Sequence, residues 1–192
     1  MRSFHWLVLI GVVALVAACR WQEQPQQAAA ATEGPGPVAP IRDVMHMIIE
    51  AQAQVIFDSV AITVTEKGTD ERQPTTEEEW DAVLHSAVTL AEAANLLMVP
   101  GRPVARPEDM NTSADPVELT PAKIQEMITA NPESWVKHAK ALQDVAMRAV
   151  KAATDKNVQE LWNIGEPIDQ VCETCHLEFW YPDDVRPAAP TQ

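Results

Sequence analysis

Three residues near the end of the chain have the types and spacing to do chemistry. Cys172, Cys175 and His176 stand in the order Cys-Glu-Thr-Cys-His. On a helix, two thiols three positions apart share one face and can add to the two vinyl groups of a haem, while the adjacent imidazole reaches the iron. The motif therefore predicts one covalently attached c-type haem (haem c), with His176 as an axial ligand of the iron.

Thiol–disulfide exchange and zinc binding also use a Cys-x-x-Cys pair, but this sequence lacks the other features that each of them requires. A thioredoxin-like dithiol occurs in a βαβ context, and a zinc site needs a second pair of Cys or His ligands. The remaining histidines outside the N-terminal region, His46, His85 and His138, are far apart in the sequence. We interpret His85 and His138 as core or boundary residues, and haem remains the favoured cofactor.

The start of the chain predicts export. Residues 1–18 contain Arg2, then a short apolar run, then two alanines before Cys19, which is the pattern of a signal peptide. The four residues that end at Cys19 also resemble a bacterial lipobox, so Cys19 is predicted to be the lipidated first residue of the mature protein. Arg20 in place of an aspartate favours the outer membrane, facing the periplasm, by analogy with lipoprotein sorting.

Composition separates a tether from a folded domain. Residues 19–40 are rich in Gln, Ala, Pro and Gly and predict a flexible tether. The formal net charge of −14 argues against nucleic acid as a partner and favours redox partner proteins that present a basic docking patch. No Ser/His/Asp arrangement, phosphate-binding glycine loop or carboxylate pair is evident, so we do not expect an enzyme.

Apolar residues recur at helical spacing over 41–181, and no strand pattern is evident. This predicts an all-α domain, an antiparallel four-helix bundle with the haem attachment motif at its C-terminal end. A capping box at Thr76 and Glu79 opens the second helix, and Asn131 and Asp155 are predicted to cap the third and fourth long helices. The predicted long helices are about 41–64, 76–99, 131–153 and 155–179, with a short helix from about 120, a long connection over 102–120, and a frayed tail over 182–192.

The first predicted helix has a clear apolar face. Met45 lies on this inward face, whereas His46 lies one position round the helix, on an edge with Ile49, Ala53 and Ile56. Large aromatic residues on other helices, Trp80, Trp135 and Trp162, also fall on inward faces and are read as core. The residues of the first face are Ile41, Val44, Met45, Ile48, Gln52, Val55, Ile56, Ser59 and Val60.

The chain resembles the class II cytochromes c, the cytochrome c′ group and its low-spin relatives. The resemblance covers about 41–181 and is most specific from Val171 to Phe179, around the Cys-x-x-Cys-His motif. It implies a four-helix bundle with the haem near the C-terminus, and many relatives form homodimers. The family commonly has a basic residue soon after the motif, where this chain has Trp180-Tyr181-Pro182, so it resembles a divergent branch.

The resemblance also implies that the first helix decides the sixth iron position. A methionine there gives a six-coordinate electron carrier, and a non-ligating residue leaves an open iron that binds small gases. Met45 is the first choice as ligand. His46 is the alternative because it stands four residues after Arg42, the family's spacing, and Met47 is the least favoured. Arg42 is predicted to pair with a haem propionate.

Three functions follow from these observations. The leading expectation is one-electron transfer by a lipid-anchored periplasmic cytochrome. The alternative is a five-coordinate haem protein that binds small gases such as NO or CO. A third reading, of a different class, is an accessory lipoprotein whose two cysteines are only a dithiol.

Overall fold

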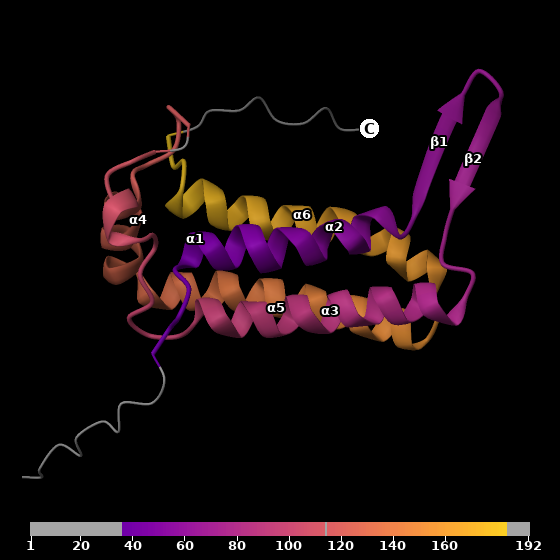
Figure 1. Cartoon of the computed structure of the whole chain (residues 1–192), viewed down its shortest axis with the longest axis horizontal. Helices are drawn as coiled ribbons and strands as arrows, with labels where there is room; N and C mark the ends of the chain where they lie inside the picture. Colours follow the sequence, from indigo (N-terminus) through magenta and orange to yellow (C-terminus); the bar gives the residue numbers. More distant parts are fainter. Residues whose placement is uncertain (1–35, 114, 184–192) are drawn as a thin grey trace, which may run out of the picture. The chain divides into compact units, whose positions relative to one another are not determined.

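Breakers and cap residues divide the chain into helical segments from Ile41 onward. The computed structural model describes residues 36–113 and 115–183, and these form five helices and one β-hairpin (Figure 1). The predicted signal peptide, Cys19, most of the predicted tether and most of the predicted tail lie outside the described residues. The elements, in order, are α1 (Ile41–Val44), the π-helix η1 (Met45–Ile49), α2 (Glu50–Asp58), β1 (Ala61–Thr65), β2 (Gly68–Arg72), α3 (Glu77–Leu97), the 3₁₀ turn η2 (Pro107–Asp109), α4 (Pro121–Ala130), α5 (Pro132–Thr154) and α6 (Val158–Phe179).

Four long helical segments pack around one apolar core. α1, η1 and α2 form one continuous helix, which packs against α3, while α3 packs against α5, α5 against α6, and α2 against α6. Successive long segments run in opposite directions in Figure 1. The prediction of a mostly helical domain is therefore confirmed. The largest fully buried side chains are Phe179, Ile41, Ile56, Leu90, Ile124, Leu161, Ile164, Ile168, Val44 and Val104.

The helix starts follow cap chemistry, with two corrections. The capping box of Thr76 and Glu79 is present at α3. Asp155 does not cap the last helix as predicted: it ends α5, and the side chain of Asn157 accepts from the backbone N–H of Glu160 instead. Asn131 precedes α5 but makes no side-chain cap there. Its amide donates backwards, to the preceding helix.

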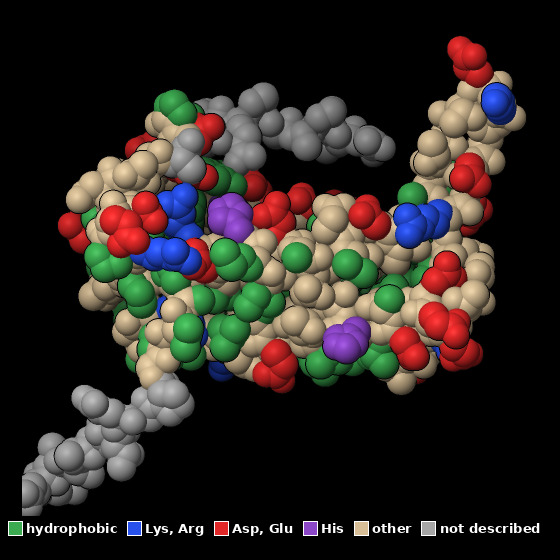
Figure 2. Space-filling view, viewed as in Figure 1, with side chains coloured by type: hydrophobic (Ala, Val, Ile, Leu, Met, Phe, Trp, Pro, Cys, Tyr) green, Lys and Arg blue, Asp and Glu red, His purple; other side chains and the backbone are tan. Residues whose placement is uncertain are grey.

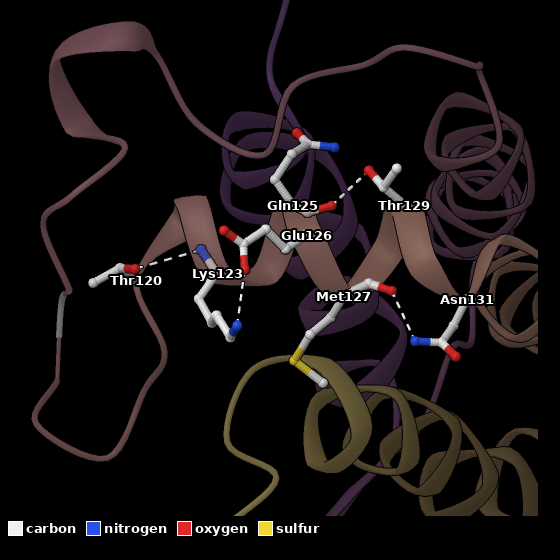
Figure 3. Close-up of polar contacts among 7 residues, drawn as sticks. All are labelled: Thr120, Lys123, Gln125, Glu126, Met127, Thr129 and Asn131. Carbon is white, nitrogen blue, oxygen red and sulfur yellow. Dashed lines mark hydrogen bonds and ion pairs between the residues drawn. The ribbon is translucent and has the colours of Figure 1, made fainter.

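The short helix α4 forms where the sequence predicts it. Thr120 caps its start by accepting from the backbone N–H of Lys123, and Asn131 closes its end by donating from Nδ2 to the carbonyl of Met127 at 3.0 Å (Figure 3). Pro121 stands at the first helical position, where a missing N–H has no consequence. α4 packs against α5 and α6, close to the end of the chain's last helix.

The prediction of an all-α domain is wrong over 61–72. The first helix ends at Asp58, not near residue 64, and an antiparallel hairpin pairs Ala61 with Arg72 and Thr65 with Gly68. The run Ile-Thr-Val-Thr is β-branched, which favours extended backbone, and Gly68 adopts φ +132° at the turn. Glu66 and Lys67 form the two-residue turn of this hairpin, between the paired residues Thr65 and Gly68.

The connection over 102–120 is hydrogen-bonded to the start of α1 and to the end of α3. The carbonyls of Pro103 and Val104 accept from the first N–H groups of α1, those of Ile41 and Arg42, at 2.8 and 3.0 Å. The buried Arg102 donates to the carbonyls of Leu96 and Ala39. We call these contacts the loop clamp, because they satisfy the orphan N–H groups at the start of the first helix.

Charge is unevenly spread over the face that Figure 2 shows. Lys and Arg side chains gather near α4 and the start of α1, whereas Asp and Glu dominate near the start of α3. Arg106 pairs with Asp43 at 2.8 Å, and the first turn of α3 contains three glutamates. Carboxylates at a helix N-terminus are favoured by the helix dipole.

Candidate functional site

The motif residues occupy one wall of a cavity. Cys172, Cys175 and His176 lie on α6, which continues as one helix through Pro167. All three are partly buried and line a cavity of about 390 Å³. Together with Val171 they are named the α6 wall. A regular helix places the two thiols on the same side, as the spacing predicts.

The first helix supplies another wall of the same cavity. Arg42, Met45, His46, Ile49 and Glu50 line it and are named the η1 wall. The structure therefore brings together the six residues that the sequence singles out for a cofactor: Cys172, Cys175, His176, Met45, His46 and Arg42. Met47, the least favoured candidate, is 67% exposed and does not line the cavity.

The π-helix changes which residues of the first helix face inward. Before it, Ile41 and Val44 are buried as predicted, and near the end of the helix the predicted inward residues Ile56, Ser59 and Val60 are buried as well. Between these two ends, Ile49 and Ala53 are buried, whereas the predicted inward positions Ile48, Gln52 and Val55 are only partly buried or exposed. A π turn has i→i+5 bonds and so accommodates one extra residue, which moves the inward face by one position directly after it. Single π turns are frequent at functional sites.

The other cavity walls are mainly apolar. α5 contributes Trp135, Ala139 and Leu142, and α6 contributes Ile168. Trp135 is buried and donates from Nε1 to the carbonyl of Leu97 at 2.8 Å, so the polar atom of its ring is satisfied. Of the three tryptophans read as core, only Trp135 reaches the cavity. Trp80 is buried elsewhere, Trp162 is partly buried, and His85 is exposed on α3.

Burial makes both motif thiols weak acids. It raises the pKa of Cys172 to about 11, with the carboxylates of Asp169 and Glu173 adding to the effect. It raises the pKa of Cys175 to about 12, with Cys172 and Glu178 adding to it. Both cysteines are free thiols in the structure. They are thus held neutral at physiological pH, close together on one wall.

Two aromatic residues after the motif surround the imidazole of His176. The ring centroid of Trp180 lies 5.6 Å from that of His176, and that of Tyr181 lies 5.9 Å away. The Tyr181 hydroxyl donates to a carboxylate oxygen of Glu173 at 2.7 Å. These residues stand where the class II cytochromes c commonly have a basic residue, and both of their rings pack against the imidazole of His176.

A polar group on α5 and α6 was missed by sequence reasoning. Glu178 accepts from the hydroxyl of Ser134 at 2.6 Å and lies 2.8 Å from Nε2 of His138. Those contacts, the Ser134 bond first, lower the pKa of Glu178. His138 lines the cavity, so it is more than the boundary residue the sequence suggests. Glu178 follows the motif by two residues, which is the only local signal that would have drawn attention to it.

A second hollow adjoins the cavity. It has a volume of about 230 Å³ and shares Arg42 and His46 with the first. The loop over 102–120 provides its other side, including Arg106, whose guanidinium pairs with Asp43 at 2.8 Å. Arg42, the predicted propionate partner, thus lies where the cavity meets this loop.

Among residues 36–113 and 115–183, no group of three or more His, Cys, Asp or Glu side chains is arranged to hold a metal ion by itself. No helix in the same part of the chain is both long and apolar enough to cross a membrane. No known family model, no curated protein and no solved structure matches this chain.

Proposed function

We propose that this chain is a lipid-anchored periplasmic mono-haem cytochrome that transfers single electrons, built as a four-helix bundle like the class II cytochromes c. One observation carries the proposal. The cavity has two thiols and an imidazole on its α6 wall, and a second imidazole and a thioether on its η1 wall. These are the donors that a covalently attached, six-coordinate haem requires.

The residues around the cavity fit such a group in size and chemistry. A volume of about 390 Å³ lies within the range of cofactor sites. Trp135, Ala139 and Leu142 offer an apolar surface to a flat macrocycle, and Arg42 offers a positive charge to a propionate. When bound, the haem would supply an iron that alternates between the ferric and ferrous states.

The chain's own residues have three tasks in this proposal. The thiols of Cys172 and Cys175 would add across the two vinyl groups of the haem to give the thioether bonds, and His176, which packs against Trp180 and Tyr181, would bind the iron. The apolar walls would exclude water, which would set the redox potential together with the iron ligands. Met45 or His46 would supply the remaining ligand. The Ser134, His138 and Glu178 group ties α5 to the end of α6 and so keeps the wall in place.

The cellular setting is proposed on sequence grounds. Lipidation at Cys19 would hold the protein at the outer membrane, and the tether would let the domain reach its partners. With a net charge of −14, the surface favours redox partners that present a basic patch, through long-range attraction that weakens with salt.

The visible absorption spectrum of the reduced full-length protein tests the function. The protein is made in a host that matures c-type haem, and the spectrum is taken before and after carbon monoxide is added. A low-spin haem spectrum that ignores the gas supports electron transfer. A spectrum that shifts contradicts it in favour of the gas-binding alternative, and a protein without haem bands contradicts both.

Attachment is tested separately with a matched pair of variants. Cys172→Ala combined with Cys175→Ala removes both thiols, so we expect no haem to remain on the chain in a denaturing gel stained for haem. Thr174→Ala lies between them but is exposed and bonds only within the helix, to Gln170, so it should keep the stain. Equal staining of the two variants would refute the assignment of the cysteines.

A further inference from the structure

We propose that His46, oriented by Glu50, is the sixth ligand, so that the iron is held between two histidines. This inference rests on the proposed function and chooses between the two ligands it leaves open. It reverses the preference for Met45 that the sequence pattern and the family resemblance suggest. Three observations on the η1 wall support it.

The first observation concerns which side chains of the helix face the cavity. His46 lines the cavity although the apolar pattern places it on the edge of the inward face, and Glu50 and Gln54, which follow it at intervals of four residues, line the same cavity. Because the π turn has i→i+5 bonds, the residues one turn after Met45 are Ile49 and Glu50, so Met45 also faces the cavity. The helix thus brings both side chains to the site, and their surroundings distinguish them.

The second observation is a carboxylate placed behind the imidazole. Nδ1 of His46 lies 3.1 Å from Oε2 of Glu50, and both residues line the cavity. A neutral imidazole that donates its Nδ1 proton to a carboxylate carries its lone pair on Nε2. Histidines that bind metals almost always have such a partner, which fixes the tautomer and the ring orientation and makes the ligand more basic. Met45 has no comparable support for its sulfur.

The third observation is the packing of the two side chains. Met45 is partly buried and packs against the hydrophobic core, which is the ordinary place of a methionine on an apolar helix. The side chain of His46 is 69% exposed, although it lines the cavity. Movement of Met45 toward an iron would leave a gap in the core, whereas His46 is mostly exposed and fills no position in the core that ligation would empty.

A consequence for the redox chemistry follows. Methionine as an axial ligand raises the potential of a haem relative to histidine. Two histidine ligands therefore place this centre lower in potential than a histidine and methionine pair in the same cavity. Glu50 adds to this effect, because a carboxylate that accepts from the ligand favours the more positive, ferric iron.

The test uses the holoprotein and reads out ligation directly. We expect the ferric wild-type protein to lack the sulfur-to-iron charge-transfer absorption of an axial methionine. We expect His46→Ala to open the iron, so that carbon monoxide shifts the reduced spectrum and added imidazole restores the low-spin form. Met47→Ala, exposed and outside the cavity, is the matched control and should behave as wild type.

Met45→Leu and Glu50→Gln complete the design. Met45→Leu should leave the reduced spectrum insensitive to carbon monoxide. Glu50→Gln should keep the low-spin spectrum and raise the midpoint potential, which a purely structural role of Glu50 would not do. The sulfur band in wild type, or an iron opened by Met45→Leu and not by His46→Ala, would overturn the inference and leave electron transfer intact. A wild-type protein that binds carbon monoxide would instead refute the proposed function itself.

Discussion

The two cavity walls that carry the proposed iron ligands are built in different ways. The α6 wall lies on a regular helix whose end is fixed by Phe179 and Trp180, both buried. The η1 wall lies on a π turn, with a side chain, His46, that is mostly exposed. The first wall is rigid and is specified by local spacing. The second depends on one extra residue in the helix and on a single carboxylate, so it is the wall where function can vary.

The largest expected difference comes from deleting one exposed residue from each of the two helices that carry the walls. Deletion of Met47 removes the extra residue of the π turn, so an α-helix can form through it while both flanks keep their faces. We expect unfolding free energy to change by about 1 kcal/mol or less. Deletion of Gln170 turns the thiols of α6 away from the face that carries Ile168, and we expect the haem protein not to accumulate. Chemical unfolding followed by circular dichroism measures the first, and haem yield the second.

Equal tolerance of the two deletions would remove the contrast between the walls. The contrast would also disappear if both deletions were equally destabilising, because the π turn would then contain no extra residue that the helix can lose.

A core substitution tests the rigidity of the α6 wall. Phe179 is fully buried and packs edge-on against Trp135, with 5.4 Å between ring centroids. Phe179→Ala should lower the free energy of unfolding by about 3–5 kcal/mol, because it leaves a cavity beside the wall. Denaturant unfolding of the holoprotein gives the value. Leu177→Ala, at a position 39% exposed, is the control and should cost about 1 kcal/mol or less.

The thiols of the same wall should react slowly before haem is attached. At pH 8, a pKa of about 11 in place of 9 lowers the thiolate fraction of Cys172 about 100-fold. Alkylation of the folded apoprotein should therefore be slower than that of the denatured chain by a similar factor, measured by mass spectrometry. The rate should rise as pH increases above 9. Alkylation at the denatured rate would show that the wall is open in the apoprotein.

Stability of the apoprotein should follow the same titration. The folded-state pKa values of Cys172 and Cys175 are raised, so their effect on stability is unchanged below the unfolded pKa near 9. Stability falls as pH rises from there toward 11 and 12, because only the unfolded chain can then ionise its thiols. Urea midpoints across this range measure the loss, and the holoprotein, whose thiols are thioethers, is the control.

The smallest expected effect concerns the bond between α5 and α6. The pKa of Glu178 is lowered, so its contribution to stability is present at neutral pH and is lost as pH falls below its unfolded pKa near 4.5. The side chain is 40% exposed, so Glu178→Gln should cost only about 1 kcal/mol at pH 7. Glu166→Gln, an exposed residue of the same helix, should cost less. If Glu178→Gln and Glu166→Gln have the same unfolding midpoint at pH 7, the contacts of Glu178 do not contribute measurably to stability.

The α6 wall can be predicted from sequence alone because the residues that define it are close together in the chain. The spacing of Cys172, Cys175 and His176 needs only a regular helix. The exact start of that helix is less evident, because Asn157 caps it in place of the predicted Asp155. The η1 wall is less accessible: Met45 and His46 are found as candidates, but a π turn has no signature in the apolar pattern and shifts the inward face by one residue. Glu178 depends on contacts with α5, which no local pattern reports.

The hairpin shows a different limit. Its β-branched residues, Ile62 to Thr65, also fit the end of an apolar helix, so the two readings compete until the turn at Gly68 is recognised. Ile62 and Val64 are 59% and 78% exposed, so no burial pattern marks them as a strand. Long helices with capping boxes are predicted well, whereas a short exposed hairpin between them is not.

The loop clamp has a mechanical consequence. Force applied to the chain before Ala39 is borne first by the hydrogen bond from Arg102 to the carbonyl of Ala39. It is borne next by the bonds from the N–H groups of Ile41 and Arg42 to the loop. These bonds lie ahead of η1 along the chain and must break before tension reaches Met45 or His46. The loop clamp therefore protects the cavity from force applied to the N-terminal segment. Such a force would break the clamp bonds before it could displace Met45 or His46.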